Sequence, residues 1–256
     1  MMKIKRFTID KLKRKVRERL SPEEKTNSFE RDEIIRKFHK LFYEEGCGNI
    51  KWFGVDTIKY PQDLITYQEI INETKPDVII ETGTHKGGSA LYFAHLFDIR
   101  GYGEVVTIDI NKLDFPKHDK IKYLTGRSDN KDILGYVELI CKNKKVMVIL
   151  DSDHDYKTVL GELRNYSKFV TKGCYLIVED TNINGHPVKK NFGKGPWEAV
   201  EEFLKKDRCF ITDLTKERFL ITANPNGFLK KVNDLKEEFE MSNEKVQNRR
   251  SLNDTK

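Results

Sequence analysis

The sequence predicts an α/β fold with a mostly parallel central sheet, helices on both faces and a C-terminal antiparallel hairpin. Short runs of β-branched and aliphatic residues alternate with longer segments whose apolar residues recur at helical spacing, as in a doubly wound sheet. Glycines or acidic residues follow several of the short runs, at the strand ends where such sheets bind ligands. With 256 residues, 38% of them hydrophobic, the chain is long enough to bury the core of this fold.

The alternation becomes regular from residue 61. Pro61 begins a helix over residues 61–74, and Pro76 prevents that helix from continuing. The strands expected after it are 77–82, 104–110, 121–126, 145–150 and 174–180, and the helices between them are 89–98, 133–142 and 156–169.

The segment after the last of these strands is a long loop over 181–196, whose length and glycines are typical of an active-site lid. A helix over 196–206 follows it. Two further apolar runs, 209–214 and 218–225, are joined by three residues and are expected to form the closing hairpin.

The chain is expected to have three parts: a basic N-terminal helical arm (1–48), a main domain (49–230) and a polar, poorly ordered C-terminal tail (231–256). Residues 1–25 contain ten Lys or Arg and four Asp or Glu, so the remaining residues carry 37 charges of each sign. A neutral main domain argues against nucleic-acid binding.

The arm itself has one apolar helical face, formed by Ile4, Phe7, Leu12, Val16 and Leu20. Such a helix is suited to peripheral contact with an anionic membrane, or to packing on its own domain or on a second copy in a homo-oligomer, and packing on protein is the favoured alternative. A second helix is expected to begin with Ser21 as N-cap before Pro22 and to end at Gly46.

The cellular compartment is predicted from what the sequence lacks. The four cysteines show neither a CxxC pair nor zinc-ligand spacing, which favours free thiols in a reducing compartment. No apolar run is long enough to span a membrane, and the N-terminal residues lack the apolar core of a signal peptide. We therefore expect a cytoplasmic protein.

The glycine-rich segment "VIIETGTHKGGSA" indicates a strand-to-helix turn that a ligand can approach closely. Gly83 and Gly88 have the spacing of a Walker phosphate loop, but Ser89 stands where that loop needs lysine. The dinucleotide fingerprint fails as well, because His85 occupies the place of its second glycine. The remaining pattern, Glu81-x-Gly83 with later glycines, suits a nucleoside ligand without a pyrophosphate.

Acidic residues end the neighbouring strands. Asp109 is placed to accept hydrogen bonds from the two ribose hydroxyls of an adenosyl group, and a turn or helix cap is the alternative role. Asp151, Glu179 and Asp180 would repel one another unless a cation neutralised them, and oxygen ligands favour a hard divalent ion such as Mg²⁺. Helix caps in water are the alternative for these acids, and Asp155 is expected to cap the next helix.

Four segments together resemble a known family: "KYPQDLITYQEIINETKPDVIIETGTHKGGSALYFA", "LDSDHDYKTVLGEL", "VEDTNINGHPV" and "GKGPWEAVEEFL". They are similar to the cephalosporin hydroxylase family, which includes rhamnosyl and macrolide-sugar O-methyltransferases. The resemblance covers roughly residues 50–230. It implies a Rossmann-like class I methyltransferase that depends on S-adenosylmethionine and on Mg²⁺ or another hard divalent cation.

The resemblance also implies roles for single residues. Asp151, Glu179 and Asp180 match the metal ligands, and His154 matches the general base of the macrolide-sugar branch, with a structural histidine as the alternative. A different alignment would shift the last two ligands to Asp180 and Thr181. The expected cofactor-binding residues are Glu81, Gly83, Thr84, Gly87, Ser89, Asp109, Ser128 and Asp151.

These roles imply an O-methyltransferase that acts on a sugar hydroxyl of a glycan or glycosylated metabolite. One alternative is a protein of hydroxylation or methoxylation, as the family name suggests, although the chain lacks a flavin motif and a two-histidine, one-carboxylate iron pattern. Another alternative is a non-catalytic, cofactor-binding accessory subunit, which the intact acids and His154 disfavour.

Overall fold

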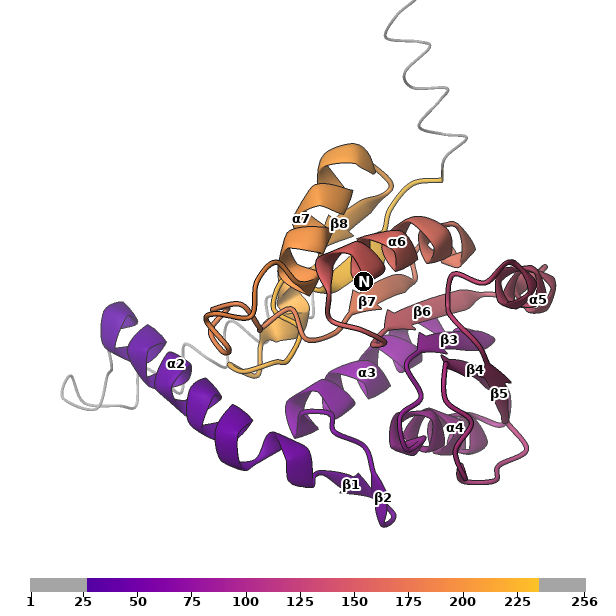
Figure 1. The fold of residues 1–256 in the computed structure, drawn as a ribbon, viewed down its shortest axis with the longest axis horizontal. Coiled ribbons are helices and arrows are strands. Elements are labelled where there is room, and N and C mark those ends of the chain that lie inside the picture. Colours follow the sequence, from indigo (N-terminus) through magenta and orange to yellow (C-terminus); the bar gives the residue numbers. More distant parts are fainter. Residues whose placement is uncertain (1–26, 235–256) are drawn as a thin grey trace, which may run out of the picture.

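The computed structural model describes residues 27–234, which form an α/β domain around a seven-stranded sheet (Figure 1). Its strands are β3 (Val78–Thr82), β4 (Glu104–Asp109), β5 (Ile121–Thr125), β6 (Val146–Leu150), β7 (Tyr175–Val178), β8 (Phe210–Thr212) and β9 (Phe228–Lys231). Their spatial order is β5-β4-β3-β6-β7-β9-β8. A separate hairpin of β1 (Lys51–Trp52) and β2 (Val55–Asp56) precedes the sheet.

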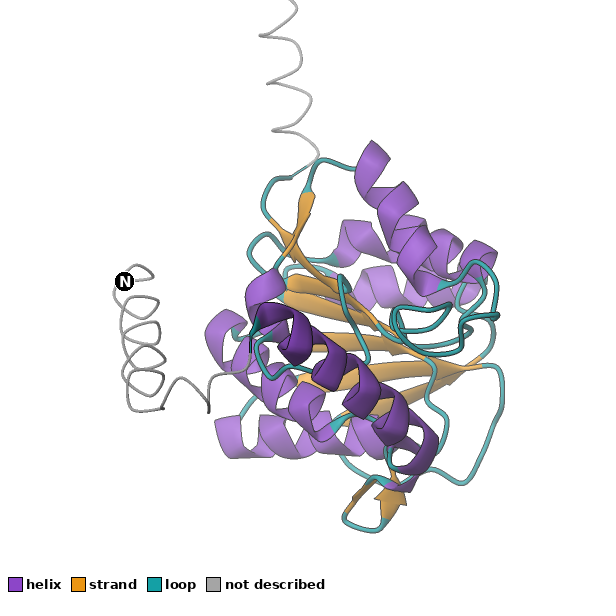
Figure 2. Cartoon of the chain, turned by 90° about the vertical axis from the view of Figure 1, so that its left-hand side faces the viewer, coloured by secondary structure: helices purple, strands orange, loops and turns teal. Residues whose placement is uncertain are grey.

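Helices cover both faces of the sheet, which confirms the predicted architecture (Figures 1 and 2). They are α2 (Ser28–Glu45), α3 (Pro61–Thr74), α4 (Gly88–Arg100), α5 (Lys131–Cys141), α6 (Tyr156–Tyr166) and α7 (Pro196–Lys206), with single 3-10 turns at η2 (Cys47–Asn49), η3 (Ser167–Phe169) and η4 (Leu214–Glu217). Apolar residues of α3 and α4 pack on one face, and those of α5, α6 and α7 pack on the other.

The order of the strands determines where a ligand can bind. β5, β4, β3, β6 and β7 are parallel, and the chain runs outward from β3 through β4 to β5 before it returns to β6 on the other side. The order therefore reverses between β3 and β6, whose last residues, Thr82 and Leu150, are partners in the sheet. Ligands of such sheets bind at this reversal, beyond the carboxyl ends of the strands.

An antiparallel pair does close the sheet, but the predicted second strand at 218–225 is wrong. The strand that pairs with β8 is β9, and the preceding segment bonds to a side chain of α3 instead. Thr222 Oγ1 donates to Asp63 Oδ1 (2.5 Å), and the Ala223 N–H donates to Asp63 Oδ2 (2.8 Å). This buried carboxylate engages the Ala223 N–H, a backbone donor that a strand would have used for its ladder, and burial raises the pKa of Asp63 to about 7.

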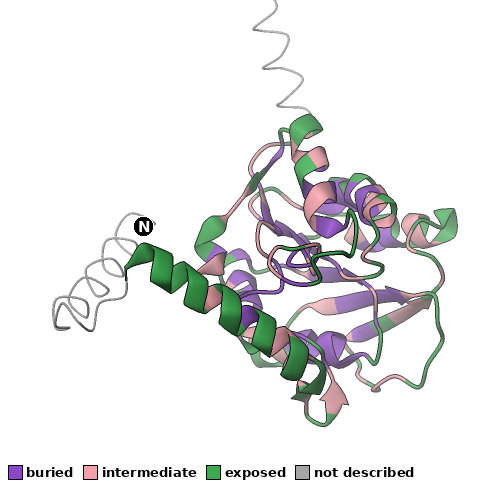
Figure 3. Ribbon diagram, turned by 60° about the vertical axis from the view of Figure 1, so that its left-hand side comes forward, coloured by how far each residue is buried: buried purple, intermediate pink, exposed green. Residues whose placement is uncertain are grey.

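Helix α2 runs across the outside of the domain (Figure 2), and most of its surface is exposed (Figure 3). It ends at Gly46, as predicted, but in the described residues it begins after a different N-cap residue, Asn27. Its inner side packs on the domain, where the rings of Phe42 and Tyr60 lie 4.7 Å apart between centroids. The predicted start at Ser21 and the apolar face of residues 4–20 lie outside the described residues.

The predicted boundaries at residues 49 and 231 stay predictions. In the described part of the chain, β9 ends at Lys231, and most of the predicted C-terminal tail lies beyond residue 234. None of the helices in residues 27–234 has the length and apolar composition needed to cross a membrane.

His39 joins α2 to the loop that follows β7. Its side chain is 5% exposed, its Nε2 lies 3.1 Å from the Asn182 side-chain nitrogen, and its ring meets that of Tyr60 edge-on at 5.5 Å. Burial lowers the pKa of His39 from 6.5 to about 4. The folded protein therefore holds His39 in its neutral form at pH values where the unfolded chain would protonate it.

We expect acid to weaken this junction. Because the folded pKa lies below the unfolded one, the stabilisation is complete above pH 6.5 and is lost as the pH falls toward 4. Between pH 7.5 and pH 5, His39 should account for a loss of about 2 kcal/mol in the free energy of unfolding measured with urea. The variant His39→Gln should lose that much less over the same interval, and the exposed control His85→Gln should behave like wild type. Equal acid sensitivity of all three proteins would contradict this assignment.

Candidate functional site

The turn after β3 brings its backbone against the end of β6. Gly83 has a φ of +87°, and a Cβ at this position would lie 1.8 Å from the carbonyl oxygen of Asp151, so only glycine fits. Gly87 is also left-handed (φ +79°) and precedes the first residue of α4. A Cβ on Gly88 would lie 2.3 Å from the Asp56 carbonyl oxygen. The glycines therefore allow close backbone packing around the turn.

Asp109, at the end of β4, fixes this turn from the other side. Its Oδ2 accepts hydrogen bonds from the backbone N–H groups of Thr84 and His85, both at 3.0 Å, and its Oδ1 accepts one from Asn111 at 2.8 Å. The side chain thus lies beside the glycine turn, where the sequence placed it. Its binding of a ribose stays a prediction.

Glu81 lies beneath the same turn and is fully buried. Its Oε2 accepts a hydrogen bond from the Thr107 hydroxyl (2.7 Å), and Thr107 in turn lies 2.7 Å from the Thr84 hydroxyl. Burial raises the pKa of Glu81 to about 7, while Lys59 and hydrogen bonds from Ser89 and Thr107 oppose the shift. Glu81 therefore connects with the glycine turn through Thr107 and Thr84 and interacts electrostatically with Lys59.

Ser128, which follows β5, contacts the end of α6. Its carbonyl oxygen accepts a hydrogen bond from the Tyr166 hydroxyl (2.7 Å). Nearby, the buried Glu162 of α6 accepts one from the Ser152 hydroxyl (2.7 Å), and burial raises the pKa of Glu162 while hydrogen bonds from Ser128 and Ser152 oppose the shift. Sequence reasoning did not identify Glu162, because its helical position gave no sign that it faces inward.

A second residue that the sequence reasoning missed, Lys59, lies among the predicted metal acids. Its side chain is 3% exposed, and its Nζ pairs with Asp151 Oδ2 and, at 2.8 Å, with Glu179 Oε1. Burial by itself would lower the pKa of Lys59, but the attraction of Asp151, Glu179 and Glu81 outweighs burial and raises it. Lys59 is therefore a fixed positive charge inside an acidic cluster.

Glu179 faces inward and is held by two further buried residues. The Tyr67 hydroxyl of α3 donates to Glu179 Oε1 (2.8 Å), and the Asn224 side chain donates to the Tyr67 hydroxyl (2.7 Å). Asn224 Oδ1 also accepts the backbone N–H of Asp180 (3.2 Å). Burial raises the pKa of Glu179, and the Lys59 ammonium opposes this shift. A continuous network thus connects Lys59 with the backbone of Asp180.

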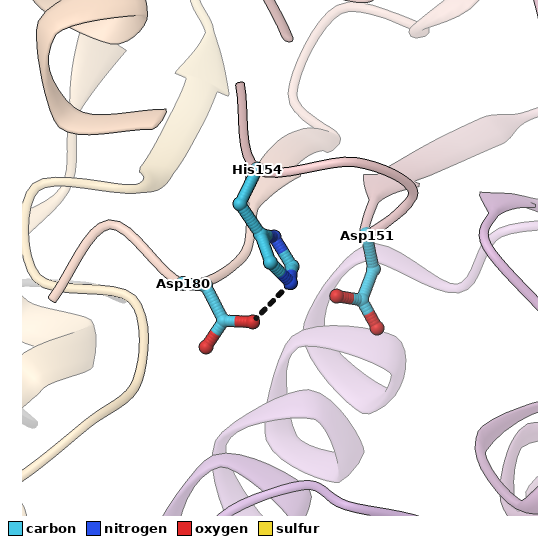
Figure 4. Close-up of side chains that lie close together, drawn as sticks. All are labelled: Asp151, His154 and Asp180. Carbon is cyan, nitrogen blue, oxygen red and sulfur yellow. Dashed lines mark ion pairs between the residues drawn. The ribbon is translucent and has the colours of Figure 1, made fainter. Parts of the chain in front are cut away.

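Three partly exposed side chains face one another at the mouth of this cluster (Figure 4). One ligand atom from each of Asp151, His154 and Asp180 lies within 4.8 Å of the other two, and His154 Nε2 is 3.1 Å from Asp180 Oδ2. In Figure 4 the two carboxylates flank the imidazole. Burial raises the pKa of Asp180, and His154 opposes the shift. Two carboxylates and an imidazole in this arrangement can hold a divalent cation.

Two other residues named in the sequence analysis, Asp155 and Thr181, lie near this group and have defined hydrogen-bond partners. Asp155 caps α6 as expected, since its Oδ1 accepts from the Lys157 N–H (3.1 Å) and its Oδ2 from the Thr158 N–H (3.0 Å). Thr181, the ligand of the shifted alignment, is fully buried, and its hydroxyl donates to the Pro225 carbonyl (2.5 Å). The predicted role of Glu179 as a ligand stays a prediction.

The loop predicted as a lid, 181–196, is folded against the start of α7. Its His186 ring stacks on Trp197, with centroids 4.2 Å apart, and His186 Nε2 lies 3.3 Å from Glu198 Oε1. Asn184 donates to the same carboxylate oxygen at 2.8 Å. The loop therefore has a defined conformation next to Asp180, which it follows in the chain.

Comparison with known proteins shows which family this sequence matches. The family model described as Rhamnosyl O-methyltransferase/CmcI matches residues 45–232. The chain is 36% identical to the rhamnosyl O-methyltransferase of Mycobacterium leprae (strain TN) over an alignment of 208 residues, and the match covers 77% of this chain and 90% of that protein. It is also 36% identical over 215 residues to the enzyme of the same name from Mycobacterium tuberculosis (strain ATCC 25618 / H37Rv), at 77% and 85% coverage.

Solved structures of CmcI have the same fold. A CmcI complex with Mg and SAM has a TM-score of 0.57 and 19% identity, and the match covers 75% of this chain and 84% of that one. An apo structure of CmcI has a TM-score of 0.56 and 20% identity, at 73% and 78% coverage. This likeness confirms the predicted class I methyltransferase fold.

Removal of the Lys59 charge should destabilise the protein strongly. In Lys59→Met the carboxylates of Asp151 and Glu179 lose their buried partner, and we expect the free energy of unfolding at pH 7 to fall by about 3–5 kcal/mol. Lys216→Met is the matched control, because Lys216 is equally buried but its partner Glu73 is half exposed (Nζ to Oε2, 2.6 Å).

The control should lose about 1 kcal/mol by the same urea titration. The double variant Lys59→Met/Glu179→Gln should recover part of the loss, since one uncompensated charge is then gone. A loss below about 1 kcal/mol for Lys59→Met would show that the ammonium does not compensate the acids.

Proposed function

Because the chain belongs to the Rhamnosyl O-methyltransferase/CmcI family, we propose that it is an S-adenosylmethionine-dependent O-methyltransferase that acts on a sugar hydroxyl of a glycan or glycosylated metabolite. It uses a divalent cation, Mg²⁺ or a similar hard ion, and His154 as general base. The observation that carries the proposal is the meeting of Asp151, His154 and Asp180 directly beside the Gly83 turn. A methyl donor at the turn and a hydroxyl at the acids would meet at the strand-order reversal.

The residues around the glycine turn fit an adenosyl cofactor. Asp109 uses only part of its acceptor capacity on backbone N–H groups, so it can also accept hydrogen bonds from a ribose. The first turn of α4 has no side-chain cap, so its backbone N–H groups lack a side-chain acceptor, as at helix starts that bind a polar group of a ligand. We assign Glu81, Gly83, Thr84, Gly87, Ser89, Asp109, Ser128 and Asp151 to this cofactor site.

The acidic cluster fits one divalent cation by its charge. Three carboxylates, of Asp151, Glu179 and Asp180, and the single ammonium of Lys59 leave two negative charges. Both described contacts of Glu179 use Oε1, which leaves Oε2 as the oxygen that could reach an ion. We therefore assign Asp151, Glu179 and Asp180 as the metal ligands, in keeping with the oxygen ligands that Mg²⁺ prefers.

His154 is the group that can take the proton of the acceptor hydroxyl. Its side chain is 36% exposed, so an acceptor can approach, and its Nε2 lies next to the Asp180 carboxylate that would hold the cation. When bound, the cation would stabilise negative charge on the acceptor oxygen, and S-adenosylmethionine would supply an electron-poor methyl group. Since Nε2 donates to Asp180 Oδ2 (3.1 Å), His154 accepts the hydroxyl proton at Nδ1, and Asp180 stabilises the imidazolium that results.

The metal assignment can be tested without an activity assay. We expect the protein to bind one Mn²⁺, measured by electron paramagnetic resonance and displaced by Mg²⁺. Asp180→Asn should weaken this binding about 100-fold, because the amide keeps the shape of the ligand and loses its charge. Asp153→Asn, on an exposed acid two residues from Asp151, should bind like wild type. Unchanged Mn²⁺ affinity of Asp180→Asn would refute the assignment.

The role of His154 predicts a loss of rate without a loss of binding. His154→Gln should lower kcat for methyl transfer to p-nitrophenyl α-L-rhamnoside by about 10²–10⁴-fold and remove the acidic limb of the pH–rate profile, where protonation of the base slows the wild-type enzyme. Its Mn²⁺ affinity should stay within about threefold of wild type. His118→Gln, whose partner is Asp98, is the control and should keep full activity. An unchanged pH–rate profile, or a loss of Mn²⁺ along with the rate, would exclude the base role.

A further inference from the structure

A cavity of about 880 Å³ lies between α2 and the loop 181–196. Helix α2 contributes Asp32, Arg36 and Lys40 to its wall, and the loop contributes Lys190. Glu217, at the end of η4, lines the opposite side. The volume lies in the range of sites that bind small molecules and short oligosaccharides. The cavity is separate from the glycine turn, where we place the cofactor.

The charges in this cavity are unevenly matched. In residues 27–234, Arg36, Lys40 and Lys190 have no acidic side chain within ion-pair distance. The wall also holds two acids: Asp32 pairs with Arg31 (3.3 Å), and burial raises the pKa of Glu217, whose Oε1 accepts the Asn226 N–H (2.8 Å). The cavity therefore presents three unpaired cations to whatever enters it.

Two contacts connect α2, on one side of the cavity, with the segment that follows Asp180. His39, which lines the cavity from α2, bonds to Asn182, two residues after Asp180. Lys189, next to Lys190, has its ammonium 5.6 Å from the centre of the Tyr43 ring on α2, and its charge opposes the rise that burial causes in the pKa of Asp180. A ligand that lies along α2 and the loop could thus occupy the cavity and also reach the catalytic group.

We propose that this cavity binds an anionic part of the acceptor, a sugar that carries a carboxylate or a phosphate. The guanidinium of Arg36 can bind either group with two parallel hydrogen bonds, and Lys40 and Lys190 add compact positive charges. The neighbouring sugar presents its hydroxyl to His154. This inference rests on the proposed methyl transfer and specifies its substrate class: an acidic glycan.

The test measures binding and does not need turnover. Three probes are compared by calorimetry at low salt: a rhamnose–glucuronate disaccharide, the same disaccharide with its carboxyl group reduced to an alcohol, and rhamnose 1-phosphate. Wild type should bind at least one of the two anionic probes about tenfold more tightly than the reduced disaccharide. The two anionic probes separate a carboxylate site from a phosphate site.

The variant Arg36→Gln/Lys40→Gln/Lys190→Gln should lose this preference. The control Lys37→Gln/Lys131→Gln/Lys205→Gln removes as many exposed charges elsewhere and should keep it. The inference is overturned if wild type shows no preference, if the cavity variant keeps it, or if the control loses it equally. Binding of S-adenosylmethionine, measured on the same proteins, should be unchanged. Failure of wild type to bind this cofactor would count against the proposed function, whereas the sugar preference judges the cavity alone.

Discussion

The ammonium group of Lys59 allows the acids of the site to lie together. Parallel strands end at one edge of the sheet, so the side chains that follow β3, β6 and β7 are brought within a few ångströms of each other. Carboxylates at such distances in a poorly solvated region repel one another and would become protonated or move apart. Lys59 contacts Asp151 and Glu179 directly, and its charge also acts on Glu81. The geometry of the site therefore depends on this one cation.

The acidic cluster around Lys59 has a buried inner part and a partly exposed outer part. The inner part, with Glu179, Tyr67 and Asn224, is buried and fixed by hydrogen bonds. The outer part, with Asp180 and His154, is partly exposed and open to ligands. Since Asn224 bonds both to Tyr67 and to the backbone of Asp180, the inner network also orients the outer acid. Rigid support behind an exposed reactive group is what proton transfer and cation binding require.

Much of the fold could be predicted because strand and helix periodicity are local signals. The β-branched runs gave the five parallel strands, and the glycines at 83, 87 and 88 gave the turn. The strand predicted at 218–225 failed for a tertiary reason: apolar spacing suits a strand, but the Thr222 hydroxyl and the Ala223 N–H bond to the buried Asp63 of α3. No local sequence pattern shows that α3 will place the Asp63 carboxylate beside residues 218–225.

The site could be predicted only in part for the same reason. Asp151, Glu179 and Asp180 follow strands, so their proximity can be inferred from the sequence of elements. Lys59 precedes a helix in an irregular segment, and nothing in its neighbours indicates that its ammonium is buried. Tyr67 lies at a core position of α3, where its hydroxyl bond to Glu179 has no sequence signal. The cation that neutralises acids at strand ends is therefore found from the three-dimensional structure and not from the sequence around it.

The proposed function requires that an adenosyl methyl donor binds at the turn between β3 and α4. Isothermal calorimetry of the full chain with S-adenosylmethionine tests it most directly, with NAD as the comparison ligand. We expect saturable binding of one S-adenosylmethionine per chain and no comparable heat with NAD, because the turn lacks a dinucleotide fingerprint. Folded protein that binds no S-adenosylmethionine, with or without Mg²⁺, would contradict it.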